Sequence, residues 1–93
     1  MADQVRQFIN TVADTVVKRD LLVHFHENPT FDNCQGLAVW INHPVEDIRQ
    51  QIDDLVAAGV LRRRGEGETA GYSYAPAPAM VALVDHFVRT YRS

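Results

Sequence analysis

Two adjacent side chains near the middle of the chain, Arg49 and Gln50, are of the types that recognise the bases of DNA. Arginine can pair bidentately with guanine, and glutamine can pair in the same way with adenine. Further along, the chain carries three consecutive arginines, Arg62, Arg63 and Arg64. Three guanidinium groups this close together favour binding to the phosphate backbone of DNA. His43 lies shortly before Arg49 and is a further candidate contact. The chemistry that these residues could perform together is the binding of nucleic acid.

Four carboxylates in the same segment oppose this chemistry: Glu46, Asp47, Asp53 and Asp54. Because Arg49 is the only arginine or lysine between residues 43 and 58, that segment has a net charge of −3. A carboxylate can accept a hydrogen bond from cytosine N4, but every nearby phosphate repels it. The four residues therefore define an alternative site, which is an acidic surface that docks a basic protein partner.

Other groups of reactive side chains give little evidence of a metal, redox or catalytic site. His24 and His26 are two residues apart, which places them on different faces of a helix, and no Cys-x-x-Cys or His-x-x-x-His spacing occurs. Cys34 precedes an expected helix start, where the helix dipole could lower the pKa of the thiol. The alternative is that Cys34 is a small buried hydrophobe. The sequence contains no nucleophile elbow, phosphate loop or paired-carboxylate site, so it predicts no catalytic residues, no metal site, no cofactor and no enzyme.

Length and composition are those of a small globular protein. A chain of 93 residues has the length of a single domain, so residues 1–93 are expected to form one. The net charge of −3 gives no overall attraction to phosphates, so DNA binding would depend on a local basic patch. No apolar run approaches the roughly 20 residues that span a bilayer, and the N-terminus lacks the features of a signal peptide. With the single cysteine, these features predict a cytoplasmic protein without a membrane partner.

Apolar periodicity predicts helix from Asp3, a candidate N-cap, to Asn28, because Pro29 disfavours its continuation. One long helix and two helices broken near residues 15–20 both fit, and the length favours two. Residues 30–33 are expected to form a brief strand that ends in an N-cap at Asp32 or Asn33. A helix of about eight residues follows it.

The next helix is expected at residues 44–58, with Pro44 as its first residue and Gly59 immediately after its end. Alternation then predicts two strands, 60–64 and 72–76, joined by a hairpin tip that contains the glycines at 65, 67 and 71. In this hairpin Arg63 faces the opposite way from its two neighbours. A final helix is expected over residues 77–93.

This order of elements resembles the winged helix-turn-helix family over residues 17–75. Ala38 occupies the tight-packing position of the first helix of the motif, and Asn42 occupies the turn, where the family favours a left-handed backbone. Ile48 matches the apolar position that locks the second helix onto the first. The stretch "IDDLVAAGVLRRRGEG" is similar to the family's exit from that helix into the wing. The resemblance implies a mostly α protein with a small β-hairpin wing.

The resemblance also carries expectations about function. In the family's docking mode the second helix of the motif faces base edges and the wing approaches phosphates. The chain is thus expected to be a DNA-binding transcriptional regulator. Residues 1–16 and 77–93 lie outside the shared motif, and in regulators of this family such helices commonly build a homodimer. The sequence does not identify the effector, the operator or the oligomeric state.

The apolar pattern predicts both a core and an aromatic contact. The expected core contains eleven side chains: Phe8, Leu21, Leu22, Phe25, Leu37, Trp40, Ile41, Ile48, Ile52, Leu55 and Leu61. Tyr72, Tyr74 and Tyr91 are expected to pack the wing onto the C-terminal helix. Phe87, Val88 and Tyr91 would meet a twofold mate in a dimer, but the sequence does not distinguish packing within a chain from packing between chains.

Overall fold

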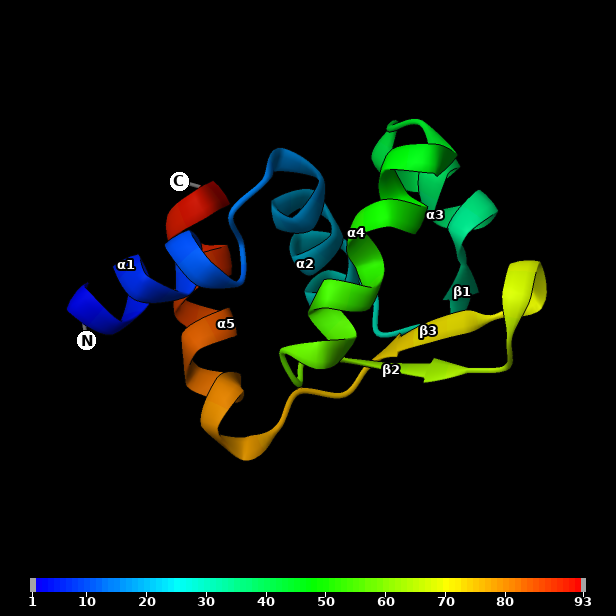
Figure 1. Cartoon of the computed structure of the whole chain (residues 1–93). Coiled ribbons are helices and arrows are strands. Elements are labelled where there is room, and N and C mark those ends of the chain that lie inside the picture. Colours follow the sequence, from blue (N-terminus) through cyan, green and yellow to red (C-terminus); the bar gives the residue numbers. More distant parts are fainter. Residues whose placement is uncertain (1, 93) are drawn as a thin grey trace.

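The computed structural model describes residues 2–92 as five α-helices around a small antiparallel sheet (Figure 1). The helices are α1 (Ala2–Thr11), α2 (Val16–Glu27), α3 (Cys34–Ile41), α4 (Val45–Ala57) and α5 (Pro78–Arg92). The strands are β1 (Asp32–Asn33), β2 (Leu61–Arg64) and β3 (Gly71–Tyr74), and a single 3-10 turn, Gly67–Thr69, lies between β2 and β3. This is the predicted mixture of mostly helix with a small β-hairpin.

The N-terminal segment forms two helices, as favoured from its length. The segment between α1 and α2 is not helical. Thr15 is the N-cap of α2, and its hydroxyl accepts a hydrogen bond from the Lys18 amide at 3.1 Å. The break thus precedes most of the expected stretch 15–20. Asp3 is not an N-cap but lies within the first turn of α1, where a carboxylate still favours the helix dipole. The second helix ends at Glu27, just before Asn28 and Pro29.

The helix-turn-helix consists of α3 and α4. Asn33 caps α3 by accepting a hydrogen bond from the Gly36 amide at 2.8 Å, and Asn42 ends α3 with a left-handed φ of 59°. Pro44 is the N-cap of α4 and not its first helical residue, because its ψ of 139° is extended. Gly59 follows the helix with a φ of 83°, as expected for a glycine after a helix end.

The three strands are ordered β1-β3-β2, and both pairings are antiparallel. Arg63 lies opposite Tyr72, and Leu61 lies opposite Tyr74, so the predicted alternation along the hairpin is confirmed. The tip contains Gly65 and Gly67, which both have positive φ. Gly71 is not in the tip but opens β3, where it leaves room for the Phe31 ring. A Cβ atom at Gly71 would lie 2.2 Å from that ring.

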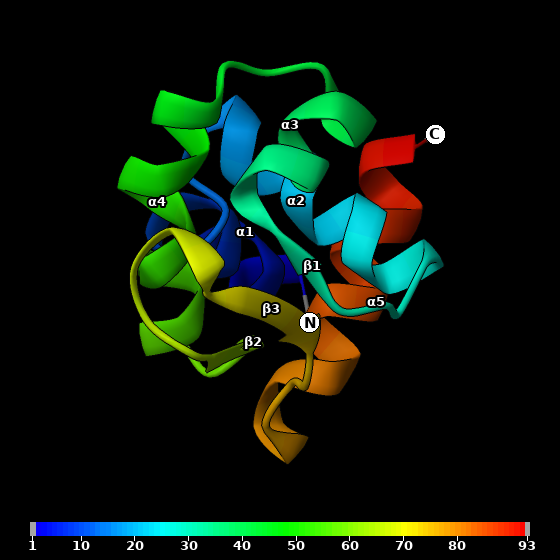
Figure 2. The same ribbon diagram turned by 90° about the vertical axis from the view of Figure 1, so that its right-hand side faces the viewer.

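The core draws on all five helices and the sheet. Nine of the eleven expected core side chains are buried and Ile41 is partly buried. Helix α5 contributes Val84, Phe87 and Val88, which are packed within the same chain, with the Phe87 ring 5.7 Å from that of Phe8. Figure 2 shows α5 running beside α1 and α2, behind the helix-turn-helix. The side chains of Phe87 and Val88 therefore pack within the chain and do not contact a twofold mate.

The expected burial of Trp40 is wrong, because 71% of its surface is exposed. Helix α3 is only two turns long, and α2 and α4 cover one side of it. Leu37 and Ile41, which are one turn apart, occupy the covered side. Val39 and Trp40 therefore lie on the other side and point to solvent.

The expected packing of the three tyrosines is also wrong. The Tyr72 hydroxyl donates to Asp53 of α4, and the Tyr74 ring lies edge-on to His26 of α2. Tyr91 stacks on Phe87 within α5 and donates to Asp20 of α2. Each ring thus joins a different pair of elements.

Candidate nucleic-acid interface

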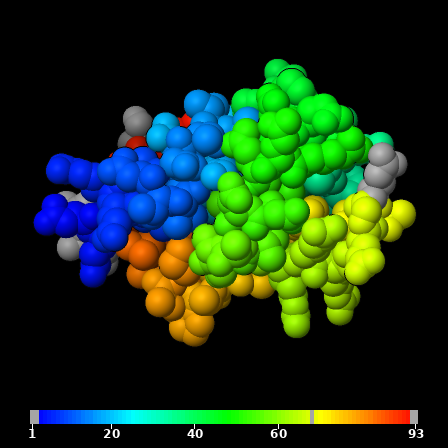
Figure 3. All heavy atoms as spheres, in the orientation of Figure 1, coloured from blue at the N-terminus to red at the C-terminus, as the bar shows by residue number. Residues whose placement is uncertain are grey.

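Helix α4 occupies the front of the molecule, with α1 and α2 on one side and the wing on the other (Figure 3). Its apolar stripe of Ile48, Ile52 and Leu55 is fully buried. Glu46, Gln50 and Asp53 are consequently exposed on the opposite side. The helix therefore presents a polar surface in the position where the family reads DNA.

His43 is turned away from this surface. Its Nε2 lies 2.7 Å from Asp20 Oδ2 of α2, and its side chain is mostly covered. The contact ties the turn before α4 to α2. His43 thus has a partner within the fold and does not belong to the exposed surface of α4.

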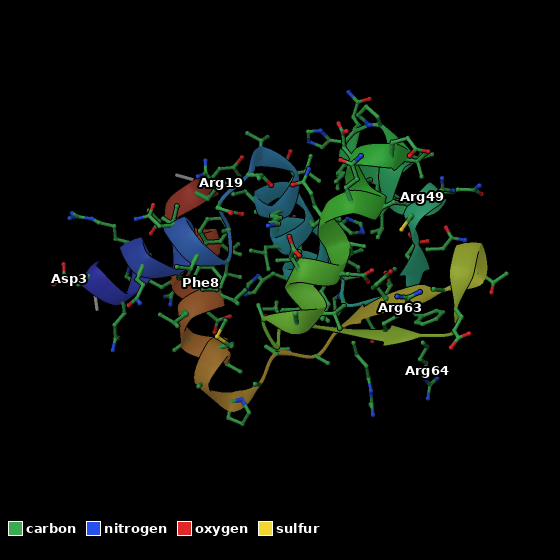
Figure 4. All side chains as sticks on the ribbon, in the orientation of Figure 1. Asp3, Phe8, Arg19, Arg49, Arg63 and Arg64 are labelled. Carbon is green, nitrogen blue, oxygen red and sulfur yellow. The ribbon has the colours of Figure 1, made fainter. Side chains whose placement is uncertain are left out.

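Arg49 is half-buried on the side of α4 that faces α3 (Figure 4). Its Nη1 donates to Glu46 Oε1, one turn earlier, at 3.1 Å. Pairs of this kind on an exposed helix surface contribute only a few tenths of a kcal/mol. The pair with Glu46 therefore contributes little to stability.

Asp53 connects α4 to the wing. Its Oδ1 accepts a hydrogen bond from the Tyr72 hydroxyl at 3.1 Å, and its Oδ2 lies 3.5 Å from Arg63 Nη1. Figure 4 shows Arg63 between α4 and β3. Asp53, Arg63 and Tyr72, called here the Asp53 cluster, thus join the helix to both strands of the hairpin.

The Asp53 cluster predicts an alkaline loss of stability. Burial, together with the hydrogen bond to Asp53, raises the pKa of Tyr72 from 10.0 to about 12. Between these values the unfolded chain releases the phenolic proton and the folded chain retains it, so the free energy of unfolding should fall by roughly 2–3 kcal/mol as pH rises. Denaturant titrations across this range measure the fall. Tyr72→Phe should remove the share of the fall that Tyr72 contributes and leave the shares of Tyr74, Tyr91 and Lys18, whose pKa values are also raised. An undiminished fall in that variant would assign the effect to those other groups.

Asp54, the last acidic residue of α4, binds the buried Lys18. The Lys18 ammonium lies 2.9 Å from Asp54 and 2.9 Å from Asp14, while its side chain is only 8% exposed. The hydrogen bond to Asp14 is the main cause that raises the pKa of Lys18, and the same bond lowers the pKa of Asp14. This ion-pair network was not predicted, because lysine is rarely buried.

Arg62 and Arg64 project from the side of the hairpin away from α4, as Figure 4 shows for Arg64. Both are exposed. Among the side chains that the structure describes, neither guanidinium group has a hydrogen-bond or ion-pair partner. Of the three consecutive arginines, these two are available to an external anion, and Arg63 belongs to the Asp53 cluster.

A cavity of about 320 Å³ separates the start of α3 from α4 and the wing. Cys34 lines it together with Arg49, Asp53, Arg63 and Tyr72. Burial raises the pKa of the Cys34 thiol, as suits the small buried hydrophobe that was expected there and not a reactive thiol. Cys34 is half-buried and forms no disulfide.

In residues 2–92, no three histidine, cysteine or acidic side chains converge as a metal site requires. None of the helices in the same range is both long and apolar enough to cross a membrane.

A helix-turn-helix followed by a β-hairpin that packs beside its second helix is the winged helix-turn-helix arrangement, and this chain has that fold. Among solved structures, HlyU from Vibrio cholerae N16961 is similar over 99% of this chain and 97% of its own, with a TM-score of 0.71 and 14% sequence identity. The likeness thus includes α1 and α5, and at this identity it is a likeness of fold. No protein-family model matches the sequence. No curated protein matches it.

Proposed function

We propose that this protein binds duplex DNA as a transcriptional regulator. The observation that carries the proposal is the geometry of the interface: the outward surface of α4 lies beside a wing with two uncommitted arginines. The fold adds support, because HlyU, to which it is similar over nearly the whole chain, is a winged-helix transcriptional regulator.

The internal ion pairs weaken the electrostatic objection. Lys18 forms an ion pair with Asp54 that it shares with Asp14, and Arg63 pairs with Asp53 at 3.5 Å, although both cations come from outside α4. Counting these two cations with the segment 43–58 reduces its net charge from −3 to −1. Arg62 and Arg64 add two positive charges, and Glu66 and Glu68 at the hairpin tip offset them, so the joint formal charge of helix and wing is −1. Only the start of α4 keeps an unpaired carboxylate, Asp47, which has no side-chain partner among the described residues.

The residues have different roles in this proposal. Arg49 and Gln50 read base edges in the major groove, because their donors and acceptors match guanine and adenine. Arg62 and Arg64 bind phosphates and fix the register without reading sequence. Arg63 positions the wing through the Asp53 cluster.

A homodimer is part of the proposal. Val81 and Tyr91 of α5 remain 42% and 43% exposed, and a shallow cavity of about 330 Å³ beside α5 is lined by Ile9, Phe87 and Tyr91, with Arg19 and Thr90. A second copy would cover the exposed side chains of Val81 and Tyr91. Two α4 helices related by a twofold axis would then meet half-sites about one helical turn apart.

The test is a selection of bound duplexes from a random pool, followed by the same selection with Arg49→Ala. The wild-type protein should enrich an inverted repeat. Arg49→Ala should lose discrimination at one base position per half-site, worth about 1–3 kcal/mol, and keep the rest of the repeat. Gln50→Ala is the matched variant and should affect a different position. The proposal would be contradicted if the wild-type protein enriched no sequence.

The acidic surface of α4 remains a second hypothesis, favoured by one observation: Asp47 and Glu46 lie at the exposed start of the helix with a net negative charge. Asp53 and Asp54 are less suited to a partner, because they already bind Arg63 and Lys18. A basic protein partner would therefore depend on Asp47. Charge reversal at Asp47 would abolish binding of that partner but would not abolish retention of DNA.

A further inference from the structure

Val39 and Trp40 are the two most exposed large apolar side chains of the described residues, at 81% and 71%. They are adjacent in sequence on α3, and both side chains are mostly open to solvent. One face of the Trp40 indole stacks on His24 of α2, with the ring centroids 6.0 Å apart and the planes at 28°. The rest of the indole is open to solvent. Exposed tryptophan beside a second apolar side chain is typical of a protein contact.

Trp40 borders a groove of about 440 Å³ between α2 and α3. In Figure 2, α3 faces the viewer and the end of α2 lies beside it. The apolar part of the lining consists of Val23, Trp40 and Ile41, and the remaining residues are Asp20, His24, Glu27 and Asn28. No arginine or lysine lines the groove, so its formal charges are both negative.

Helix dipoles add to this negative potential. Asn28 is the C-cap of α2, and Ile41 is the last residue of α3, so both helices end at the groove. The carbonyl groups at helix C-termini favour cations. The face of an indole also attracts a guanidinium or an ammonium group. Carboxylates, helix ends and the aromatic ring thus all favour a positively charged ligand beside an apolar surface.

We propose that this groove binds a segment of a partner protein that carries arginine or lysine next to apolar side chains. The apolar residues of the segment would cover Val39 and Trp40, and its cations would lie over the indole and beside Asp20. Asp20 already accepts hydrogen bonds from His43 and Tyr91, which fix its position without filling the groove. DNA does not fit this chemistry, because its phosphates would meet carboxylates and helix C-termini. The site is separate from the α4 surface and does not depend on the proposed DNA binding.

Trp40 is the only tryptophan in the chain, so its fluorescence reports on this groove directly. The experiment titrates the whole protein with a tryptophan-free amphipathic peptide of leucine and lysine, and with a matched peptide of leucine and glutamate. The leucine–lysine peptide should shift the emission to shorter wavelength in a saturable manner, and added salt should weaken its binding. The leucine–glutamate peptide should leave the emission unchanged.

Variants locate the binding. With a labelled leucine–lysine peptide, Trp40→Ala and Val39→Ser should each weaken binding about tenfold or more. Both side chains are mostly exposed, so circular dichroism should show native folding. If Trp40→Ala does not fold, Val39→Ser decides the question. Asp47→Asn, on α4, is the control and should bind as the wild type does.

Four results would overturn the proposal. They are no saturable emission shift, equal binding of the two peptides, undiminished binding by Val39→Ser, or loss of binding in Asp47→Asn, which would place the peptide on α4. A shift of Trp40 emission by duplex DNA that the peptide reverses would assign the groove to DNA instead.

Discussion

Removing Arg62 and Arg64 together is expected to weaken DNA binding more than any other change on the surface. Each phosphate contact contributes a slope of about −0.9 to the dependence of log K on log salt, and a dimer would lose four such contacts. Arg62→Ala/Arg64→Ala should therefore reduce the magnitude of the slope by about 3–4. Near 0.1 M salt the affinity should fall by as much as roughly a thousandfold. Anisotropy titrations of a labelled duplex over a salt series measure both quantities.

The loss should be the same for all DNA sequences, because phosphate contacts carry no base information. Arg6→Ala is the control, since Arg6 is an exposed arginine on α1, away from α4 and the wing. It should change neither the slope nor the affinity appreciably. A double variant with the wild-type slope would show that the wing does not touch the backbone.

Replacing Lys18 by methionine is expected to lower the free energy of unfolding by about 2–4 kcal/mol. The change keeps the apolar volume but leaves Asp14 and Asp54 side by side without their shared cation. Breaking a fully buried ion pair costs about 3–5 kcal/mol, and here the carboxylates are partly exposed, which reduces the cost. Denaturant titrations followed by circular dichroism measure the difference.

The effect of Lys18 should depend on pH in a defined way. The raised pKa of Lys18 means that its contribution is complete below 10.5 and is lost as pH rises beyond that value. The lowered pKa of Asp14 means that its contribution is complete above 3.8 and is lost as pH falls. Wild type and Lys18→Met should thus differ most between these limits. Arg6→Met, at an exposed site, should change stability by less than about 0.5 kcal/mol at any pH, and an equally small effect of Lys18→Met would contradict the network.

Local chemistry explains why the elements could be predicted. Asn33, Asn42 and Gly59 act at single helix ends through their own backbone or side-chain geometry, and each does in the structure what the sequence predicts. The stripe of α4 and the alternation of the hairpin are likewise periodic signals that need no knowledge of neighbours. The start of α4 was predicted one residue too early, at Pro44, because proline is tolerated both at the N-cap and in the first turn of a helix.

The exposure of Trp40 and the burial of Lys18 could not be predicted from such local signals. Residues 37–41 are all apolar, so periodicity does not indicate which side of so short a helix is covered. Lys18 lies next to Arg19 and has the composition of a solvated surface, but its partner Asp54 is 36 residues away. Both positions depend on contacts between distant segments, and one sequence does not reveal such contacts.

The candidate site was predicted in part for the same reason. The sequence places Arg49, Gln50 and the three arginines on the right elements, and strand alternation separates Arg63 from its neighbours. The pairing of Asp53 with Arg63 and Tyr72, and of His43 with Asp20, appears only in the structure. The ion pair of Asp53 with Arg63, together with that of Asp54 with Lys18, partly offsets the negative charge of α4, which was the main argument against DNA binding.

The central claim is that the chain binds duplex DNA, and a fluorescence-anisotropy titration with random-sequence duplex at about 50 mM salt tests it most directly. Low salt exposes even non-specific binding, because phosphate contacts release counterions. The proposal predicts saturable binding with an affinity that falls steeply as salt is added. No binding at tens of micromolar protein would contradict it, and the winged helix would then have to act through a protein partner.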